Sequence, residues 1–370
     1  MKGSRSRFFI MNLIVATILL LSLSRTSNAL ADGGSIDTFA SVPADPGFPE
    51  GIAVYGKYVY VSGPARFGTA GTGPSAIQVY NRKTGALEST IHVAGEALAF
   101  EHALSNIAVD EGGRIYALST QLGLIRFTKV DGTFVQDSYG APLPDLPTCG
   151  AAAPGTPCAP TFPAFVDFPP IPNDIVFDAA GFAYVTDSLQ ATIFRYAPGG
   201  GTPEIWFQSP LFQGGGPIPF GANGIRLNPM RDTLYVVVST SAADPNLGTI
   251  YQLPLVDAPT PADVQVFHSY TFSELPDQLA FGADGNLYVS LALSNQISIL
   301  APDGTELTRL QSAGTDAIPL DNPAGIAFDS RTRSLLIANH ALLSGNAAHF
   351  AVLQVYVGDA GDPLVQPVLP

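Results

Sequence analysis

The segment PNDIVFDAAGFAYVTDS, residues 172–188, contains two short apolar runs separated by a turn with a glycine. Runs of this length, rich in β-branched and aromatic residues and joined by such a turn, are typical of a β-hairpin. The first run begins directly after Asn173 and Asp174, so two polar residues open an apolar strand. One hairpin does not explain this polar pair, and the same pattern has to be sought elsewhere in the chain.

The pattern occurs six times. The other copies are PEGIAVYGKYVYVSG (49–63), LSNIAVDEGGRIYALST (104–120), ANGIRLNPMRDTLYVVVST (222–240), PDQLAFGADGNLYVSLA (276–292) and PAGIAFDSRTRSLLIAN (323–339). They align on one apolar position, the anchor residue, which is Ile52, Ile107, Ile175, Ile225, Leu279 and Ile326. Successive anchor residues lie 55, 68, 50, 54 and 47 positions apart, a spacing typical of four-stranded propeller blades.

Most copies are followed by one or two further strand-like runs, and no segment has the sustained apolar spacing of a helix. The sequence therefore predicts an all-β chain that folds as a six-bladed β-propeller with four-stranded blades. The segment SIDTFASVP, residues 35–43, is expected to supply the outermost strand of the last blade and so close the ring.

The first 31 residues are set apart from this repeat. Lys2, Arg5 and Arg7 precede an apolar run from Phe8 to about Leu23, and Ala29-Leu30-Ala31 follows as a cleavage signal. This order predicts a signal peptide over residues 1–31, because the apolar run is shorter than the roughly 20 residues of a membrane span. An uncleaved anchor helix is the alternative. We expect a periplasmic or secreted protein with one propeller domain over 32–370 and no membrane span in the mature chain.

Charge and cysteine content narrow the function classes. Without residues 1–31 the chain has 13 basic and 31 acidic residues, a balance near −18 that makes nucleic acid an unfavourable partner. The two cysteines, Cys149 and Cys158, are predicted to form a disulfide, because an exported chain meets an oxidising compartment. Their spacing lacks the further Cys or His of a zinc site.

In a propeller the first strand of every blade lines the central channel, so the residues two positions before the anchor residues should lie at equivalent places. We call this set the polar ring. Its members are Glu50, Ser105, Asn173, Asn223, Asp277 and Ala324. Four of them carry a carboxylate or amide oxygen, which is the ligand type that calcium prefers. The simpler interpretation is that polar residues tolerate a wet channel.

The matching pieces PEGIAV, PNDIVF, ANGIRL and PDQLAF resemble the family of calcium-dependent six-bladed propellers that includes senescence marker protein, gluconolactonase and diisopropylfluorophosphatase, with the paraoxonases as more distant members. The resemblance covers essentially the whole mature chain. It implies that Glu50, Asn173, Asn223 and Asp277 bind a catalytic Ca²⁺, and that Asp277 acts as general base or nucleophile. Magnesium or another divalent cation is the alternative, although Mg²⁺ prefers a tight, water-rich octahedral shell.

Four further residues are weaker candidates. Asp174 is expected either to orient the ligands around it or to cap backbone amides, and Asp187 either to line the site or to end a strand. His102 and His340 lie near the predicted channel mouth, but no motif ties them to the chemistry.

The predicted activity is hydrolysis of a lactone or ester, with a phosphotriester as a further possibility. Sugar-lactone members of the family have an arginine just before the PND motif where this chain has Ile171, so we expect a rather apolar small-molecule substrate. Residues between Cys158 and the PND motif are predicted to cover the channel mouth. An apolar vestibule is predicted from Phe162, Phe165, Phe168, Phe212 and Phe220. The alternative is that these aromatic residues only pin long loops to the rim of the propeller. The alternative function is a non-catalytic binding protein with a structural calcium ion.

Overall fold

The computed structural model describes residues 35–160, 169–216 and 219–370. In these ranges the chain forms 24 β-strands and three short 3-10 helices, and no α-helix occurs among them. The 3-10 helices are η1 (Pro210–Phe212), η2 (Pro261–Asp263) and η3 (Ala347–His349). No helix within the described ranges is long and apolar enough to cross a membrane.

Three of the sheets are antiparallel four-stranded meanders, in which each strand pairs with the next along the chain. The first contains β2 (Ile52–Tyr55), β3 (Tyr58–Gly63), β4 (Ala76–Asn81) and β5 (Leu87–His92). The second contains β14 (Ala222–Leu227), β15 (Thr233–Val238), β16 (Leu247–Pro254) and β17 (Gln265–Thr271). The third contains β18 (Pro276–Phe281), β19 (Leu287–Leu291), β20 (Gln296–Leu300) and β21 (Glu306–Gln311).

An eight-stranded sheet consists of two such meanders that share one edge. One half has β6 (Leu104–Val109), β7 (Ile115–Ser119), β8 (Gly123–Val130) and β9 (Thr133–Gly140). The other half has β10 (Pro172–Phe177), β11 (Ala183–Asp187), β12 (Thr192–Ala197) and β13 (Gly200–Gln208). The halves meet through one parallel pairing, Gly201 with Gly140, between the outer strands β13 and β9.

The last sheet joins segments from opposite ends of the chain. Its order is β1 (Asp37–Ser41), β24 (Ala351–Tyr356), β23 (Ser334–Asn339) and β22 (Pro323–Asp329). The pairing of β1 with β24 confirms the predicted outermost strand.

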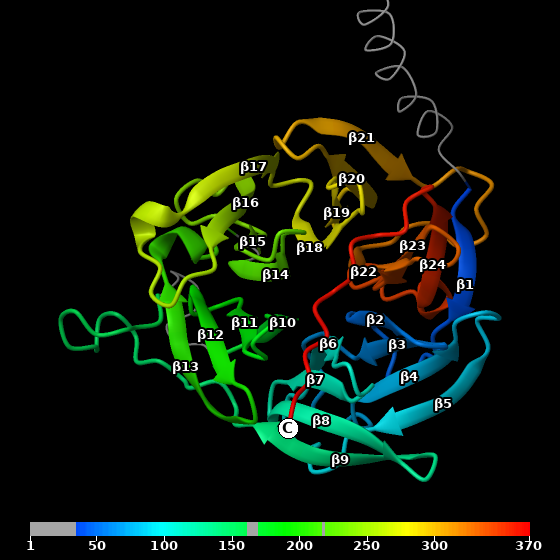
Figure 1. The fold of residues 1–370 in the computed structure, drawn as a ribbon, viewed down its shortest axis with the longest axis horizontal. Helices are drawn as coiled ribbons and strands as arrows, with labels where there is room; N and C mark the ends of the chain where they lie inside the picture. The colour runs from blue at the N-terminus through cyan, green and yellow to red at the C-terminus, as the bar shows by residue number, and fades with distance from the viewer. Residues whose placement is uncertain (1–34, 161–168, 217–218) are drawn as a thin grey trace, which may run out of the picture. The chain divides into compact units, whose positions relative to one another are not determined.

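The first strands of the successive meanders pack against one another in a closed cycle: β2 contacts β6, then β10, β14, β18 and β22 follow, and β22 contacts β2. Figure 1 shows the sheets fanning outward from this central set of strands. All six anchor residues are buried. Between neighbouring sheets lie apolar clusters, such as the one that joins Val176 and Tyr184 to Ile225 and Val236. The fold is all-β and propeller-like.

A register shift recurs at the start of the inner strands. In β10 the ladder to β11 passes from Pro172 directly to Ile175, so Asn173 and Asp174 stand outside the regular pairing. The same shift lies before the anchor residue in β6, β14, β18 and β22. Irregularities of this kind change the direction in which side chains point. In these five strands, they allow two consecutive residues to face the central channel.

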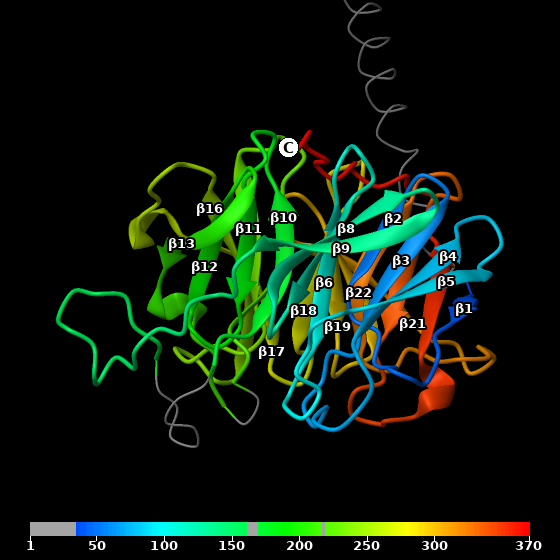
Figure 2. The same ribbon diagram turned by 90° about the horizontal axis from the view of Figure 1, so that it is seen from below.

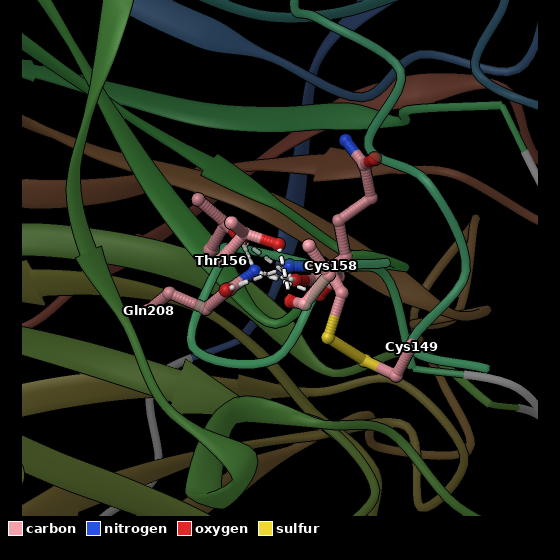
Figure 3. Close-up of a disulfide and its surroundings, with 7 residues drawn as sticks. Cys149, Thr156, Cys158 and Gln208 are labelled. Carbon is pink, nitrogen blue, oxygen red and sulfur yellow. Dashed lines mark hydrogen bonds between the residues drawn. A yellow bond between two sulfur atoms is a disulfide. The ribbon is translucent and has the colours of Figure 1, made fainter. Parts of the chain in front are cut away.

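Cys149 and Cys158 form the predicted disulfide, with their Cα atoms 4.8 Å apart (Figure 3). The loop between them is held against the adjacent sheet by the Gln208 side chain. Its amide oxygen accepts from the Cys158 N–H at 3.2 Å, and its amide nitrogen donates to the Cys158 carbonyl at 3.0 Å. This loop leads into residues 161–168. The predicted covering segment with Phe162, Phe165 and Phe168 therefore lies largely outside the described residues.

Residues 357–370 run across one end of the central strands, as the red segment in Figures 1 and 2 shows. Asp359 accepts from the Ala283 N–H at 2.9 Å, beyond the end of β18. The Asp362 carboxylate lies 2.5 Å from Nη1 of Arg231, a residue beyond the end of β14. The Pro370 carbonyl accepts from Arg114 at 2.7 Å, next to β7. This end of the channel is thus tied down by contacts to three separate sheets.

Candidate functional site

A cavity of about 450 Å³ opens at the other end of the central strands. Five members of the polar ring line it, and the sixth, Ala324, is buried beside it. The lining members are Glu50, Ser105, Asn173, Asn223 and Asp277. The structure therefore brings all four predicted metal ligands together, although they come from four different sheets.

Two of these side chains have buried oxygens without a hydrogen-bond partner. Glu50 Oε2 and Asn223 Oδ1 are both shielded from solvent, and neither accepts a hydrogen bond from the described residues. A buried acceptor without a donor costs about 1–3 kcal/mol. Unpaired buried oxygens that face one cavity are thus a feature that a bound cation would satisfy.

His340 contacts the same carboxylate. Its Nδ1 lies 2.9 Å from Glu50 Oε2, a contact that is an ion pair only if the imidazole is protonated. The other ring nitrogen, Nε2, is buried without a partner. His340 is therefore an immediate neighbour of a predicted ligand.

Asp277 is the second carboxylate of the cavity. Burial raises the pKa of Asp277 well above its usual range, and the charge of Glu50 raises it further, while a contact from the Asn223 amide partly offsets both. Glu50 and Asp277 both line the cavity, and the charge of Glu50 disfavours ionisation of Asp277. Two carboxylates held together in this way are stabilised by a divalent cation.

The donor set fits a hard cation. It combines two carboxylates with two amides, and the Asn173 and Asn223 amides are fixed by contacts to Gln278 at 3.4 Å and to Ser239 at 2.8 Å. In the part of the chain that the structure describes, no three His, Cys, Asp or Glu side chains form a metal-binding group by themselves. The amide oxygens are consequently essential to this predicted set, which suits calcium better than zinc or copper.

Beneath the polar ring lies a second layer, which we call the inner layer. It contains the residues directly before the anchor residues: Gly51, Asn106, Asp174, Gly224, Gln278 and Gly325. The three polar side chains bond across the channel. Asn106 donates to Asp174 and, at 3.3 Å, to Gln278. At each of the three glycines, a side chain would collide with the neighbouring strand. The inner layer therefore fills the channel below the cavity.

Asp174 is the centre of this layer. Its carboxylate accepts from the Ile175 N–H at 2.7 Å, the Ile225 N–H at 2.8 Å and the Arg226 guanidinium at 2.6 Å. Burial raises the pKa of Asp174, and Arg226 counteracts that increase. Asp174 thus joins three inner strands and does not line the cavity, and its hydrogen bonds with two backbone amides correspond to the predicted capping alternative.

Two further candidates are placed elsewhere. Asp187 is buried at the end of β11, where it accepts from the backbone N–H groups of Leu189 at 2.9 Å and Gln190 at 3.0 Å. Of its two predicted roles, lining the site and ending a strand, these contacts correspond to the second. Phe212 was expected in the vestibule, but it is fully buried in the apolar core, so this prediction is wrong. The 3-10 helix η1 turns its side chain inward against Phe207 and Tyr251.

The upper wall of the cavity is largely apolar. Phe220 stacks on Phe67, with ring centroids 6.2 Å apart and planes 6° from parallel. Ile171, the residue directly before the PND motif, lines the cavity, and His102 lines it as well. The further apolar lining includes Pro169, Pro170, Leu275, Leu293, Leu342 and Leu343. The polar ring thus lies at the bottom of a largely apolar cavity, and we call its five lining members the polar floor.

The β3–β4 connection, residues 64–75, carries Phe67 and is held by Glu101. The Glu101 carboxylate accepts from the N–H groups of Gly68 at 2.8 Å, Thr69 at 3.0 Å and Ala70 at 3.3 Å. These backbone hydrogen bonds, that of Thr69 foremost, hold the pKa of Glu101 below its usual value. Glu101 therefore fixes one wall of the cavity.

We expect Glu101→Gln to loosen this wall, because an amide oxygen is a weaker acceptor than a carboxylate. Hydrogen exchange of the Gly68, Thr69 and Ala70 amides should be faster in the variant than in the parent. Since its pKa is lowered in the folded state, the stabilisation from Glu101 is present above the unfolded value and is lost as pH falls through the folded value. Equal exchange rates in both proteins near neutral pH would contradict the assignment.

Comparisons with known proteins support the fold. The structure is similar to regucalcin, a calcium-binding protein from Agrobacterium tumefaciens, at 14% identity, with a TM-score of 0.59 and coverage of 91% of this chain and 98% of the other. A provisionally named gluconolactonase matches at 17% identity and a TM-score of 0.56, with coverage of 90% and 95%. Virginiamycin B lyase from Staphylococcus aureus matches at 15% identity and a TM-score of 0.52, with coverage of 87% of this chain and 99% of the other.

Neither a family model nor a curated protein matches the sequence. The structural neighbours, regucalcin and a gluconolactonase among them, are consistent with the resemblance found in the sequence. At these identities they establish the fold, and the chemistry has to be argued from the cavity.

Proposed function

We propose that the cavity is the active site of a calcium-dependent hydrolase of the gluconolactonase-like kind, acting on a lactone or ester. The observation that carries this proposal is that two carboxylates, Glu50 and Asp277, and two amides, Asn173 and Asn223, line one cavity, with Asn223 Oδ1 buried and without a hydrogen-bond partner. We further propose that the eight-stranded sheet counts as two blades, which makes six four-stranded blades. Export to the periplasm or beyond is the proposal for the signal-like residues 1–31.

Each residue of the floor has a role in this proposal. Glu50, Asn173, Asn223 and Asp277 hold the cation, and Asp277 is also the general base or nucleophile. A bound Ca²⁺ would supply Lewis-acid polarisation of a carbonyl oxygen. Asn106, Asp174 and Gln278 of the inner layer fix the backbone under these side chains. The apolar wall with Phe67 and Phe220 excludes bulk water, which strengthens the electrostatic interactions at the floor.

The size and lining of the cavity favour a small molecule. A volume of about 450 Å³ is in the range of ligand pockets, and most of the lining above the floor is apolar. The supported substrate class is a small, largely apolar lactone or ester. A neutral phosphotriester has a phosphoryl oxygen that a cation can polarise in the same way, so it is included among the test substrates.

The first experiment compares metal-stripped protein before and after calcium is restored, using an aliphatic lactone, an aryl ester and a paraoxon-type triester. We expect calcium-dependent turnover of the lactone or the ester. Calcium at about 100 times its dissociation constant should also stabilise the fold by about 2.7 kcal/mol, measured as a shift in melting temperature.

The alternative function is a binding protein with a structural ion. It is favoured if calcium raises the melting temperature while none of the three substrates is hydrolysed at any calcium concentration. Hydrolysis that persists in metal-stripped protein would contradict the metal-dependent proposal itself.

A further inference from the structure

Arg66 stands out among the arginines of the described residues because it is partly buried and has no acidic partner within 4.0 Å. Eight of the other nine lie within 4.0 Å of a carboxylate: Arg82, Arg114, Arg126, Arg195, Arg226, Arg231, Arg309 and Arg331. The ninth, Arg333, is exposed at a turn. Arg66 is only partly exposed and lines the cavity. A partly buried guanidinium without a counter-ion is costly unless an anion joins it.

The guanidinium of Arg66 has a defined position. Its Cζ lies 4.6 Å from the centre of the Phe48 ring, a cation–π contact. Its Nη1 donates to the Phe67 carbonyl at 3.3 Å, and its Nε is buried without a partner. The supporting connection is itself fixed by the three backbone hydrogen bonds to Glu101. The side chain is therefore pre-organised, although nothing anionic in the described residues holds it.

Arg66 also lies within reach of the polar floor. The Phe48 ring that it contacts is 6.2 Å from the His340 ring, and His340 contacts Glu50. Together these contacts place the Arg66 Cζ no more than about 11 Å from the centre of the His340 ring. One small molecule can therefore span both sites, with its reacting carbonyl at the floor and a second group at Arg66.

We propose that Arg66 binds a carboxylate of the substrate, so that the preferred lactone or ester carries a negatively charged group at its far end. This inference rests on the proposed function and narrows its substrate class. A planar carboxylate matches the two donors at the end of the guanidinium in a bidentate, charge-assisted pair. Phe67 and Phe220 line the same cavity, so the middle of the molecule is expected to be apolar.

A binding experiment tests this separately from catalysis. The probes are adipic acid monoanilide and hexanoic acid anilide, which share an amide carbonyl and chain length and differ in the terminal carboxylate. Isothermal titration with calcium-loaded protein should show at least tenfold tighter binding of the carboxylate probe, the effect of a hydrogen bond to a charged group. Arg66→Met should bring the ratio close to one, and Arg66→Lys should keep part of it.

The control variant is Arg331→Met, in the exposed turn that follows β22, which should keep the full ratio of the parent. If the parent protein does not discriminate between the probes, or if Arg66→Met discriminates as well as the parent, the proposal is wrong. If discrimination depends on Arg66 but no ester is hydrolysed, the carboxylate site stands and the hydrolase proposal fails. The esters 4-nitrophenyl hydrogen adipate and 4-nitrophenyl hexanoate then extend the comparison to turnover, where the same ratio is expected in kcat/KM.

Discussion

Asp277→Asn is expected to lower turnover by about a thousandfold or more while the fold is retained, since loss of a single preorganised electrostatic group already costs 10²–10³ in kcat. Asparagine keeps the shape and one oxygen of the side chain but loses the charge that the cation and the proton transfer need. The measurement is kcat/KM with the best substrate of the calcium panel. Asp303→Asn, at an exposed turn far from the cavity, is the matched control and should keep activity.

In the metal-free protein, Asp277→Asn is expected to increase thermal stability. Because the pKa of Asp277 is raised in the folded state, the folded protein binds a proton that the unfolded chain has already released. The stability of the metal-free parent should therefore fall as pH rises from the usual aspartate value through the raised value. The asparagine side chain of the variant does not titrate, so in chelator near neutral pH the variant should melt at a higher temperature than the parent. A lower melting temperature would contradict the raised pKa of Asp277, which burial and then the charge of Glu50 cause.

Arg226→Met is expected to destabilise the protein by about 3–5 kcal/mol, because it leaves the fully buried Asp174 carboxylate without its counter-ion. The loss should appear in urea unfolding followed by tryptophan fluorescence, with Trp206 as the only tryptophan. The double variant Asp174→Asn with Arg226→Met should recover part of the loss, since it removes the unpaired charge.

Arg195→Met provides the comparison, because its partner Glu204 is largely exposed. A surface pair of this kind contributes about 1 kcal/mol or less. Similar losses for Arg195→Met and Arg226→Met would mean that the pair at the centre of the inner layer has no special structural role.

The repeat of the anchor residues predicted most of the fold. Each anchor residue lies in the first strand of a meander, and the β1–β24 closure follows from the one strand-like run before the first repeat. Local pattern suffices here because each hairpin consists of two neighbouring apolar runs joined by a short turn, so one repeat contains both strands that pair. The link between β9 and β13 could not be foreseen, because one backbone pairing between two glycines leaves no side-chain pattern.

The polar ring of the candidate site was predicted from the sequence, but the inner layer beneath it was not. A regular strand would place Asn173 and Asp174 on opposite faces. The register shift lets the first line the cavity and the second bind inner strands on both sides, and side-chain periodicity does not reveal such a shift. The three glycines of the inner layer were the available signal, since they occupy the same aligned position as Asn106, Asp174 and Gln278.

The contacts of individual side chains were the hardest to predict. Glu50 and His340 are 290 positions apart, and no local motif joins them, yet the closed cycle of strands places them in contact. Phe212 and Phe220 flank the same loop, but one is buried and the other stacks on Phe67. Exposure of a loop aromatic depends on tertiary packing, which the sequence of the loop does not encode by itself.

The pairing of β1 with β24 has a consequence for folding kinetics. Asp37 pairs with Gln354, so the last sheet cannot be completed until nearly the whole chain has been synthesised and collapsed. Contacts of such long sequence separation slow folding, because the chain entropy of closure is lost before the contact forms. The other meanders assemble from consecutive strands and can form early. We therefore expect a late, rate-limiting ring closure, during which the free edge of β24 is open to pairing with other chains.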